Sequence, residues 1–162
     1  MTMRRAYIGL GANLGEPARQ VRDALDAIAL RFPMLARSPL YRSRAIGLAG
    51  QPDYCNAACC VALELEPQVL MDALLEIERA AGRVRDGRKW GPRLLDLDLL
   101  HVEGVVMESA SLTLPHPEVH RRNFVLRPLA DIEPGLFIPG VGVVSEAVAG
   151  AGADGLSAWA DK

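Results

Sequence analysis

The chain has 162 residues, half of them hydrophobic, and a formal net charge of −2. This length and composition suit one compact domain, which we expect to span residues 1–162. The sequence has no apolar run of the ~20 residues that a membrane span needs and no secretory signal at its start, and its charge supplies no overall field to attract nucleic acid. We therefore expect a cytoplasmic protein without membrane or nucleic-acid partners, and we take it to be a monomer.

Three cysteines, Cys55, Cys59 and Cys60, lie close together in one segment. An odd number of crowded cysteines does not suggest a disulfide framework, and a zinc site would draw its ligands from several segments. These cysteines are therefore predicted to be reduced thiols of the core.

The first elements are inferred from hydrophobic spacing and from proline. Residues 4–10 are expected to form a strand, and Pro17 opens a helix, because proline is favoured in the first helical turn. The apolar residues at helical spacing are Val21, Leu25, Ile28 and Phe32. A short strand is predicted over residues 38–43, followed by a loop over residues 44–52.

A long strand is predicted next, over residues 54–65. Alternation places its more apolar residues on one face and both Tyr54 and Asn56 on the other. Pro67 begins a second helix, and Gly82 is expected to close it. The apolar residues on one side of this helix are Leu70, Leu74, Ile77 and Ala81.

The remaining elements are a strand over residues 94–102, a turn at 115–117 and a short helix over 120–129. The tail from Gly150 onward is rich in glycine and alanine and is expected to be irregular or weakly helical. The order β-α-β-β-α-β predicts an α+β fold of the ferredoxin-like kind, a two-layer sandwich with helices packed on a mainly antiparallel sheet. Many functions use this fold, so the order of elements does not predict the chemistry.

Two aspartates, Asp96 and Asp98, alternate with leucines in the strand predicted over residues 94–102. Strand alternation sends both carboxylates to one face, with their Cα atoms ~6.6 Å apart. At this spacing the carboxylates can converge on a hard cation such as Mg²⁺, which binds oxygen ligands together with substrate phosphates. The pattern also fits an amphipathic strand with a solvated acidic face, and taken alone it favours that interpretation.

A stretch rich in arginine and glycine, residues 82–93, comes directly before the aspartates and carries five basic residues and one acidic residue. Arginine forks match phosphate oxygens, and carboxylates hold the Mg²⁺ that neutralises the same phosphates. A polyphosphate site needs both signs side by side, but mutual salt bridges or a solvated loop would use the same residues. The glycines would also allow the stretch to close as a lid.

Other residues could complete a site. Tyr54 and Asn56 share a strand face, where a ring and an amide suit a flat heterocycle, although a half-buried tyrosine beside a surface asparagine is the commoner arrangement. His116 lies between two prolines, which is more often a rigid turn than a site. Residues 9–15 match neither the dinucleotide-binding nor the P-loop motif, so this glycine-rich segment is interpreted as a tight strand-to-helix turn.

Several segments form a series along the chain, namely residues 7–15, 53–57, 78–85, 90–98, 115–117 and 122–126. Their content and order resemble the 6-hydroxymethyl-7,8-dihydropterin pyrophosphokinases over roughly residues 5–140. The most specific part is Trp-Gly-Pro-Arg at 90–93, which runs into the paired aspartates. The resemblance implies an ATP-dependent diphosphotransferase of folate biosynthesis. Such an enzyme moves pyrophosphate from ATP-Mg to the hydroxymethyl group of the reduced pterin and releases AMP.

The resemblance also implies which residues bind the phosphates. In that family the aspartates matching Asp96 and Asp98 bind two Mg²⁺ ions on the ATP phosphates. The arginines matching Arg83 and Arg93 contact the triphosphate and belong, with the aspartates, to the catalytic set. The loops over residues 44–52 and 86–91 would be mobile lids.

The pterin site is implied in the same way. Rings matching Tyr54 and Phe124 sandwich the pterin in that family, and the amide matching Asn56 forms hydrogen bonds with it. The further positions implied at the ATP site or in its network are Glu78, Arg85, Trp90, His116 and Arg122.

One segment departs from the family. Residues 41–47 read Tyr-Arg-Ser-Arg-Ala-Ile-Gly, where the family usually has Thr-x-Pro-x-Gly after the Tyr-Arg pair. Ser43 keeps the hydroxyl, whereas Ala45 lacks the fixed φ of proline, so the resemblance does not imply the resting shape of this loop. Arg44 adds a positive charge that could meet substrate or solvent.

Two other classes of function remain open. An RNA-binding α+β module would use the basic stretch, but the chain lacks the aromatic-rich strand motif of such modules and has a negative net charge. A regulatory domain that binds a small ligand would have no need of paired metal-binding aspartates. Formation of AMP from ATP, Mg²⁺ and hydroxymethyl-dihydropterin would separate the three.

Overall fold

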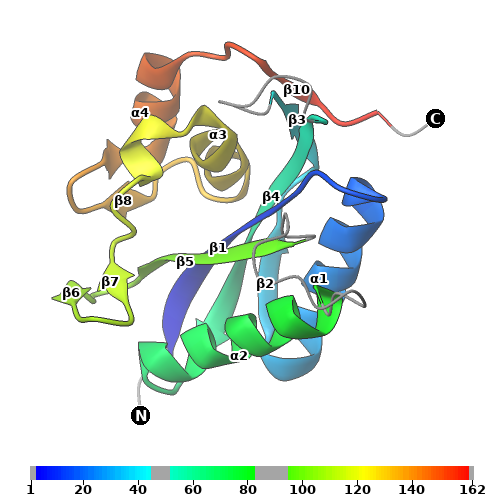
Figure 1. Cartoon of the computed structure of the whole chain (residues 1–162). Helices are drawn as coiled ribbons and strands as arrows, with labels where there is room; N and C mark the ends of the chain where they lie inside the picture. Colours follow the sequence, from blue (N-terminus) through cyan, green and yellow to red (C-terminus); the bar gives the residue numbers. More distant parts are fainter. Residues whose placement is uncertain (1–2, 45–51, 83–94, 161–162) are drawn as a thin grey trace.

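The computed structural model describes residues 3–44, 52–82 and 95–160 (Figure 1). Its first elements are β1 (Arg4–Ala12), α1 (Pro17–Arg31), β2 (Met34–Arg37), β3 (Tyr41–Ser43), β4 (Tyr54–Leu63) and α2 (Pro67–Ala81). The later elements are β5 (Asp96–Val102), β6 (Met107–Glu108), β7 (Thr113–Leu114), the 3-10 helix η1 (Val119–Arg121), α3 (Asn123–Ile132), β8 (Phe137–Ile138), β9 (Gly142–Val143), α4 (Val144–Ala151) and β10 (Leu156–Ala158). Both helices that were predicted to begin at proline are confirmed.

The main sheet is antiparallel, with its strands in the order β10-β3-β4-β1-β5 and with β2 also paired to β4. Because β2 and β3 both lie along β4, they behave as one interrupted strand, and the path β3-β4-β1-β5 is that of a ferredoxin-like sheet. The predicted α+β fold is therefore confirmed. Within the described ranges, no helix combines the length and the apolar character needed to cross a membrane.

Both faces of the sheet are buried. Helices α1 and α2 cover one face, and α3 packs against the other (Figure 1). Ile8 and Leu97 belong to the first core, whereas Tyr7 and Leu100 belong to the second. A strand covered on both sides must be apolar on both sides, which explains the nearly continuous run of small and apolar residues in β4. The α3 side adds a partial third layer to the predicted two-layer sandwich.

The cysteines of β4 lie in these two cores. All three carry free thiols and are buried, as predicted. Cys59 lies in the core beneath α1 and α2, and burial raises the pKa of its thiol to about 12. Cys60 points to the opposite face, beneath α3, and burial raises the pKa of its thiol to about 11. Neither thiol is ionised near neutral pH.

Two strand predictions need correction. The strand predicted over residues 38–43 is shorter, because β3 begins only at Tyr41, and a separate strand that was not predicted, β2, precedes it over Met34–Arg37. Between these two strands the Ser38 hydroxyl accepts a hydrogen bond from the backbone N–H of Ala58 at 2.9 Å, while the backbone N–H of Ser38 donates to the Ala58 carbonyl at 2.9 Å. The tail also differs from the prediction, because α4 continues to Ala151 and the chain then forms β10, which pairs with β3.

Several predicted boundaries shift. Strand β4 ends at Leu63, not at residue 65, and the helix predicted over 120–129 is the short η1 followed by α3. Gly82 does follow α2, where its N–H donates to the Glu78 carbonyl at 2.7 Å. Its φ of −95° shows that this helix ends without a left-handed residue.

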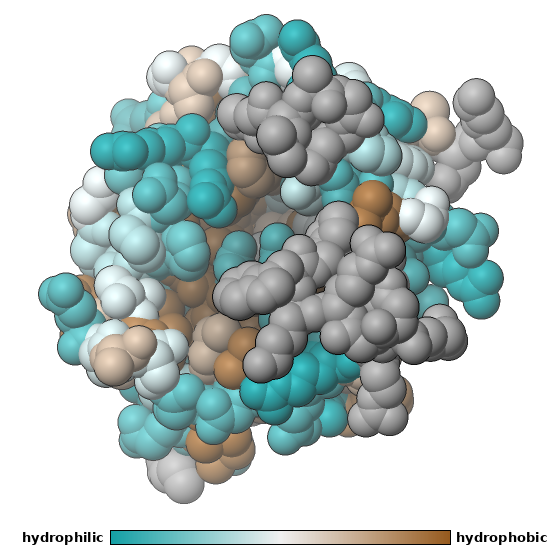
Figure 2. Space-filling model, viewed as in Figure 1, coloured by the Kyte–Doolittle hydropathy of each residue, from teal (hydrophilic) through white to brown (hydrophobic). Residues whose placement is uncertain are grey.

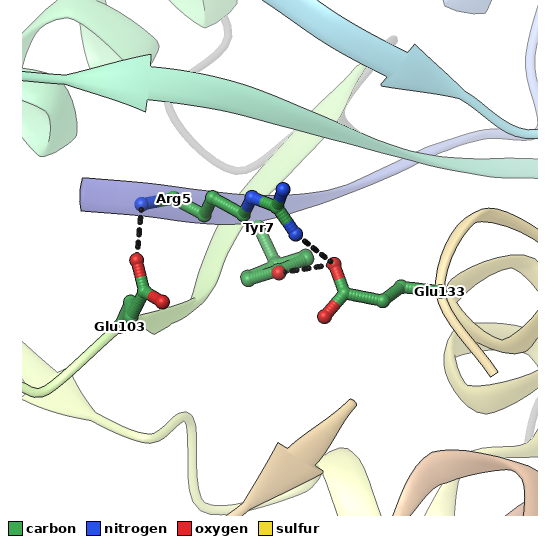
Figure 3. Close-up of polar contacts among 4 residues, drawn as sticks. All are labelled: Arg5, Tyr7, Glu103 and Glu133. Atoms are coloured by element: carbon green, nitrogen blue, oxygen red, sulfur yellow. Dashed lines mark hydrogen bonds and ion pairs between the residues drawn. The ribbon is translucent and has the colours of Figure 1, made fainter. Parts of the chain in front are cut away.

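A polar cluster fastens the end of α3 to the sheet (Figure 3). The Tyr7 hydroxyl donates to Glu133 Oε1 at 2.6 Å, and the Arg5 guanidinium reaches the same oxygen at 3.3 Å. The backbone N–H of Arg5 donates to Glu103 Oε1 at 3.2 Å, which joins the end of β5 to the cluster. Burial, together with the hydrogen bond to Glu133, raises the pKa of the Tyr7 phenol well above its ordinary value of 10.0.

We expect the Tyr7 hydroxyl to make stability depend on alkaline pH. Its folded-state pKa is raised, so its contribution is complete below pH 10.0 and is lost as the pH rises above that value. Tyr7→Phe should reduce the free energy of unfolding by ~1.5–3 kcal/mol at neutral pH, since a hydrogen bond to a charged group is lost. Urea unfolding at about pH 8 and about pH 11 measures this. A variant that loses as much stability as the parent chain between these two values would contradict the assignment.

Candidate active site

A cavity of about 460 Å³ opens on the α3 side of the sheet. Its lining residues come from β1, β3, β4, β5, η1, α3 and the links that join them, and they are Gly9, Leu10, Gly11, Ser43, Arg44, Tyr54, Asn56, Ala57, Asp96, Asp98, Arg121, Arg122, Phe124 and Val125. Figure 2 shows the molecule hollowed near the middle of the viewed face, where hydrophobic and hydrophilic side chains adjoin. This cavity brings together six residues predicted for the site: Tyr54, Asn56, Asp96, Asp98, Arg122 and Phe124.

The floor of the cavity is a row of residues across three strands. Gly11 of β1 lies between Asn56 of β4 and Asp96 of β5, and Gly9 pairs with Asp98. Neighbouring strands lie ~4.8 Å apart, so Asn56 and Asp96 are separated by roughly 10 Å along this row. The row therefore has an amide end and a carboxylate end, with glycine between them.

Because the two glycines have no side chains, they leave space above the sheet at the floor of the cavity. A Cβ atom on Gly11 would lie 3.4 Å from Asn56 Oδ1, and one on Gly9 would lie 3.3 Å from Leu100 Cδ1. Gly9 lies within the strand predicted over residues 4–10, whereas Gly11 was expected in the tight turn and lies instead in β1, which continues to Ala12. Their alternation with the core residues of β1 was a signal in the sequence that this strand face must stay open.

The carboxylate end follows the alternation that the sequence predicts. Leu97 and Leu99 are buried, whereas Asp96 and Asp98 are only partly buried and line the cavity. Glu78 of α2 accepts a hydrogen bond at 2.7 Å from the backbone N–H of Leu97, the residue between the two aspartates. The Glu78 carboxylate thus holds the backbone that carries both site carboxylates.

We expect Glu78 to act as a positioning residue. Glu78→Ala should reduce the free energy of unfolding by ~1.5–3 kcal/mol, because the Leu97 N–H donates to a charged acceptor and would lose it. Glu78→Gln keeps an acceptor oxygen and should lose less. Thermal melting of both variants measures the difference, and equal losses would show that the carboxylate does not act through this hydrogen bond.

His116 lies beside the carboxylate end. Its Nδ1 accepts a hydrogen bond from the backbone N–H of Glu118 at 3.2 Å, and its Nε2 is 4.0 Å from Asp98 Oδ1. Because Nδ1 is an acceptor, the neutral ring carries its proton on Nε2, on the side of Asp98. His116 is therefore placed to orient Asp98 or to meet a ligand bound there.

The donor set fits a metal that arrives with its substrate. Within the described part of the chain, no group of three or more His, Cys, Asp or Glu side chains is arranged to hold a metal ion. Asp96 and Asp98 supply carboxylate oxygens on one face, which are ligands that Mg²⁺ favours, and Mg²⁺ commonly takes its other ligands from water and substrate phosphates. Two carboxylates beside an open cavity suit that kind of binding.

The amide end is held by a buried hydrogen bond. The Nδ2 atom of Asn56 donates to Ser43 Oγ at 2.7 Å, and the Asn56 residue is 4% exposed. Tyr54 lies on β4 and Phe124 at the start of α3, so the two rings line the cavity from the sheet and from the helix layer. This end combines aromatic faces with a fixed amide, an arrangement suited to a flat polar ring.

Three arginines described by the structure contribute positive charge to the cavity: Arg44, Arg121 and Arg122. The guanidinium of Arg122 lies 5.9 Å from the Phe124 ring centroid. Arg121 is not among the site residues predicted from the sequence, and the turn of η1 brings it to the cavity. The predicted site residues Arg83, Arg85, Trp90 and Arg93, and the lid residue Ala45, lie outside the described residues.

Comparison with known proteins identifies the family of this chain. Residues 7–134 match the model of the 7,8-dihydro-6-hydroxymethylpterin-pyrophosphokinase (HPPK) family. The chain belongs to the HPPK family. Proteins named 2-amino-4-hydroxy-6-hydroxymethyldihydropteridine pyrophosphokinase are similar along most of their length. The one from Haemophilus influenzae is 41% identical over 88% of this chain and 90% of its own, and the one from Pseudomonas aeruginosa is 45% identical over 85% of each.

Solved structures show the same fold. The Plasmodium falciparum HPPK-DHPS protein, crystallised with pterin and p-hydrobenzoate, matches 92% of this chain with a TM-score of 0.68 and 11% sequence identity. This HPPK chain spans 44% of the length of that protein. At such low identity the match carries the fold alone, while the family assignment rests on the sequence relatives.

Proposed function

We infer that this HPPK-family enzyme transfers the pyrophosphoryl group of ATP to the hydroxymethyl group of 6-hydroxymethyl-7,8-dihydropterin, giving the pterin diphosphate and AMP. The observation that carries the assignment of the site is the Asn56-Gly11-Asp96 row. It supports a pterin at the amide end and phosphates at the carboxylate end of one cavity. The roughly 10 Å between the two ends suits a substrate whose ring and reacting arm lie along the row.

The pterin would lie between Tyr54 and Phe124, with the Asn56 amide at its polar edge. Aromatic rings stacked on a heterocycle gain contact area and a favourable ring geometry. Ser43 holds the Asn56 amide in one orientation, so pterin binding costs less side-chain conformational entropy than it would with a mobile side chain. This arrangement would orient the hydroxymethyl arm along Gly11 toward the aspartates.

Asp96 and Asp98 are the proposed ligands of two Mg²⁺ ions that accompany ATP. Bound to these carboxylates, the ions would neutralise negative charge on the ATP phosphates. The chain itself contributes the spacing of the two carboxylates, the Glu78 carboxylate that accepts a hydrogen bond from the backbone between them, and the His116 ring beside Asp98.

In the transfer itself, the hydroxymethyl oxygen attacks the β-phosphorus of ATP, and the bond from that phosphorus to the α-phosphate oxygen breaks. AMP leaves, and the substrate hydroxyl loses its proton. Phosphoryl-type transfer depends mainly on positioning and on charge stabilisation, so no covalent protein nucleophile is required. Arg121 and Arg122 supply positive charge on the α3 side of the cavity, and Arg83 and Arg93 are proposed for the triphosphate.

The reaction is tested by mixing the protein with ATP, Mg²⁺ and 6-hydroxymethyl-7,8-dihydropterin and separating the nucleotides by chromatography. AMP should appear in a one-to-one ratio with the pterin diphosphate. A matched substrate with a methyl group in place of hydroxymethyl should give no AMP. Formation of ADP would indicate transfer of a single phosphate, and binding without a new nucleotide would indicate a ligand-binding module instead.

A further inference from the structure

We propose that the C-terminal segment over residues 152–159, the C-terminal clasp, is a positioning element that holds the two walls of the pterin pocket together. The inference rests on the proposed pterin site. The clasp lies beyond residues 7–134, which match the family model, and its residues are not among those that line the cavity. It therefore acts through its neighbours and not by touching the substrate.

One part of the clasp holds β3. Strand β10 pairs with β3 in antiparallel register, with Leu156 opposite Ser43. The backbone N–H of Arg44 donates to the Gly155 carbonyl at 3.3 Å, and the backbone N–H of Trp159 donates to the Leu40 carbonyl at 3.0 Å. These bonds extend the pairing beyond both ends of β3. A strand of three residues is thus paired on both sides, with β4 and with β10.

A cation–π contact adds to this pairing. The Arg42 guanidinium lies 4.1 Å from the centroid of the Trp159 ring, and Trp159 is partly buried against the core beneath α1 and α2. Such contacts strengthen as they leave water. The hydroxyl of Ser43, next to Arg42, accepts the hydrogen bond from Asn56. The position of the pterin-binding amide therefore depends on a strand that the clasp holds in place.

The other part of the clasp holds the start of α3. The Nδ2 atom of Asn123 donates to two clasp carbonyls, Gly152 at 3.2 Å and Asp154 at 3.1 Å. Asn123 directly precedes Phe124, the aromatic residue on the helix side of the pocket. Gly152 and Gly155 have φ of +77° and +72°, which lets the chain turn between α4 and β10 without strain.

The clasp thus joins β3 and α3 at the end where the pterin would bind. At the other end of α3, the Tyr41 hydroxyl donates to the Asp131 carboxylate, so the far ends of the same two elements are already joined. The exposed Arg44–Asp154 ion pair adds little, because water screens it. Loss of the clasp contacts should leave the chain folded. It should allow the Asn56 and Phe124 walls of the pocket to move relative to each other, and binding of a flat ligand would then be weaker because the walls must first be ordered.

The test compares pterin and ATP binding by calorimetry in Asn123→Ala and Trp159→Ala, with ATP represented by a non-hydrolysable analogue and Mg²⁺. Each variant should raise the Kd for hydroxymethyl-dihydropterin by about tenfold, equivalent to ~1.4 kcal/mol. The Kd for the nucleotide should change far less. Trp159→Phe keeps an aromatic ring for Arg42 and should recover most of the pterin affinity. Ser157→Ala, which alters an exposed side chain of β10, should behave as the parent chain does.

Thermal melting of each variant shows whether it is folded, and Asn123→Ala carries the test if Trp159→Ala unfolds. Equal weakening for pterin and nucleotide, or unchanged pterin affinity in a folded Asn123→Ala, would overturn the inference while leaving the proposed function intact. Failure of the parent chain to bind the pterin or to form AMP would overturn the proposed function, and this inference with it.

Discussion

Asp98→Asn should lower the rate of AMP formation by roughly 10²–10³-fold, the loss typical when one preorganised group that stabilises charge is removed. Asparagine keeps the size of the side chain but removes a negative charge and a strong Mg²⁺ ligand. Asp96→Asn should behave alike, and both variants should need more Mg²⁺ to reach their own maximum rate. The measurement is AMP formation across a Mg²⁺ titration.

The control is Asp23→Asn, which removes a carboxylate that is 70% exposed on α1, paired at 3.8 Å with Arg19. This change should leave both rate and Mg²⁺ dependence unaltered, because exposed aspartates tolerate it within ~0.5 kcal/mol. Melting temperatures establish that all three variants are folded. If Asp96→Asn and Asp98→Asn were folded and as active as Asp23→Asn, the two aspartates would be an ordinary solvated strand face.

The second large effect is expected at Asn56. Asn56→Ala should weaken binding of hydroxymethyl-dihydropterin by ~1–3 kcal/mol, because a buried heterocycle would lose hydrogen-bonding partners, while the affinity for nucleotide stays nearly unchanged. Calorimetry with each ligand measures both affinities.

Ser43→Ala provides the matched comparison, since it removes the 2.7 Å contact that holds the amide but leaves the amide itself. Its effect on pterin affinity should be in the same direction and smaller. Equal losses of pterin and nucleotide affinity in Asn56→Ala would show that Asn56 supports the fold and not the pterin.

The predictions from the sequence were most accurate for features that depend on a single strand or helix. The alternation of leucine and aspartate in β5 predicts correctly which side chains leave the core, since period-two alternation is local. Pro17 and Pro67 likewise mark the starts of α1 and α2, because the missing N–H of proline costs nothing in a first turn. The order of these elements is enough to indicate the ferredoxin-like sheet.

What the sequence did not predict depends on which strands become neighbours. The tail was expected to be irregular or weakly helical because it is rich in glycine and alanine, and only pairing with β3 makes three of its residues the strand β10. The role of Gly11 needed the register that sets it between Asn56 and Asp96. The hydrogen bond that the Leu97 N–H donates to the Glu78 carboxylate joins β5 to α2, and nothing in either segment alone specifies it.

The opposed burial of Cys59 and Cys60 gives the molecule a pair of adjacent chemical reporters. A thiol reagent can label Cys60 only when the α3 layer lifts from the sheet, and can label Cys59 only when the core beneath α1 and α2 opens. The ratio of the two labelling rates therefore compares how often each of the two helix layers separates from the sheet, measured at adjacent residues of one strand. Since α3 carries Phe124 at the cavity, protection of Cys60 by a ligand would report how firmly that ligand holds the helix against the sheet.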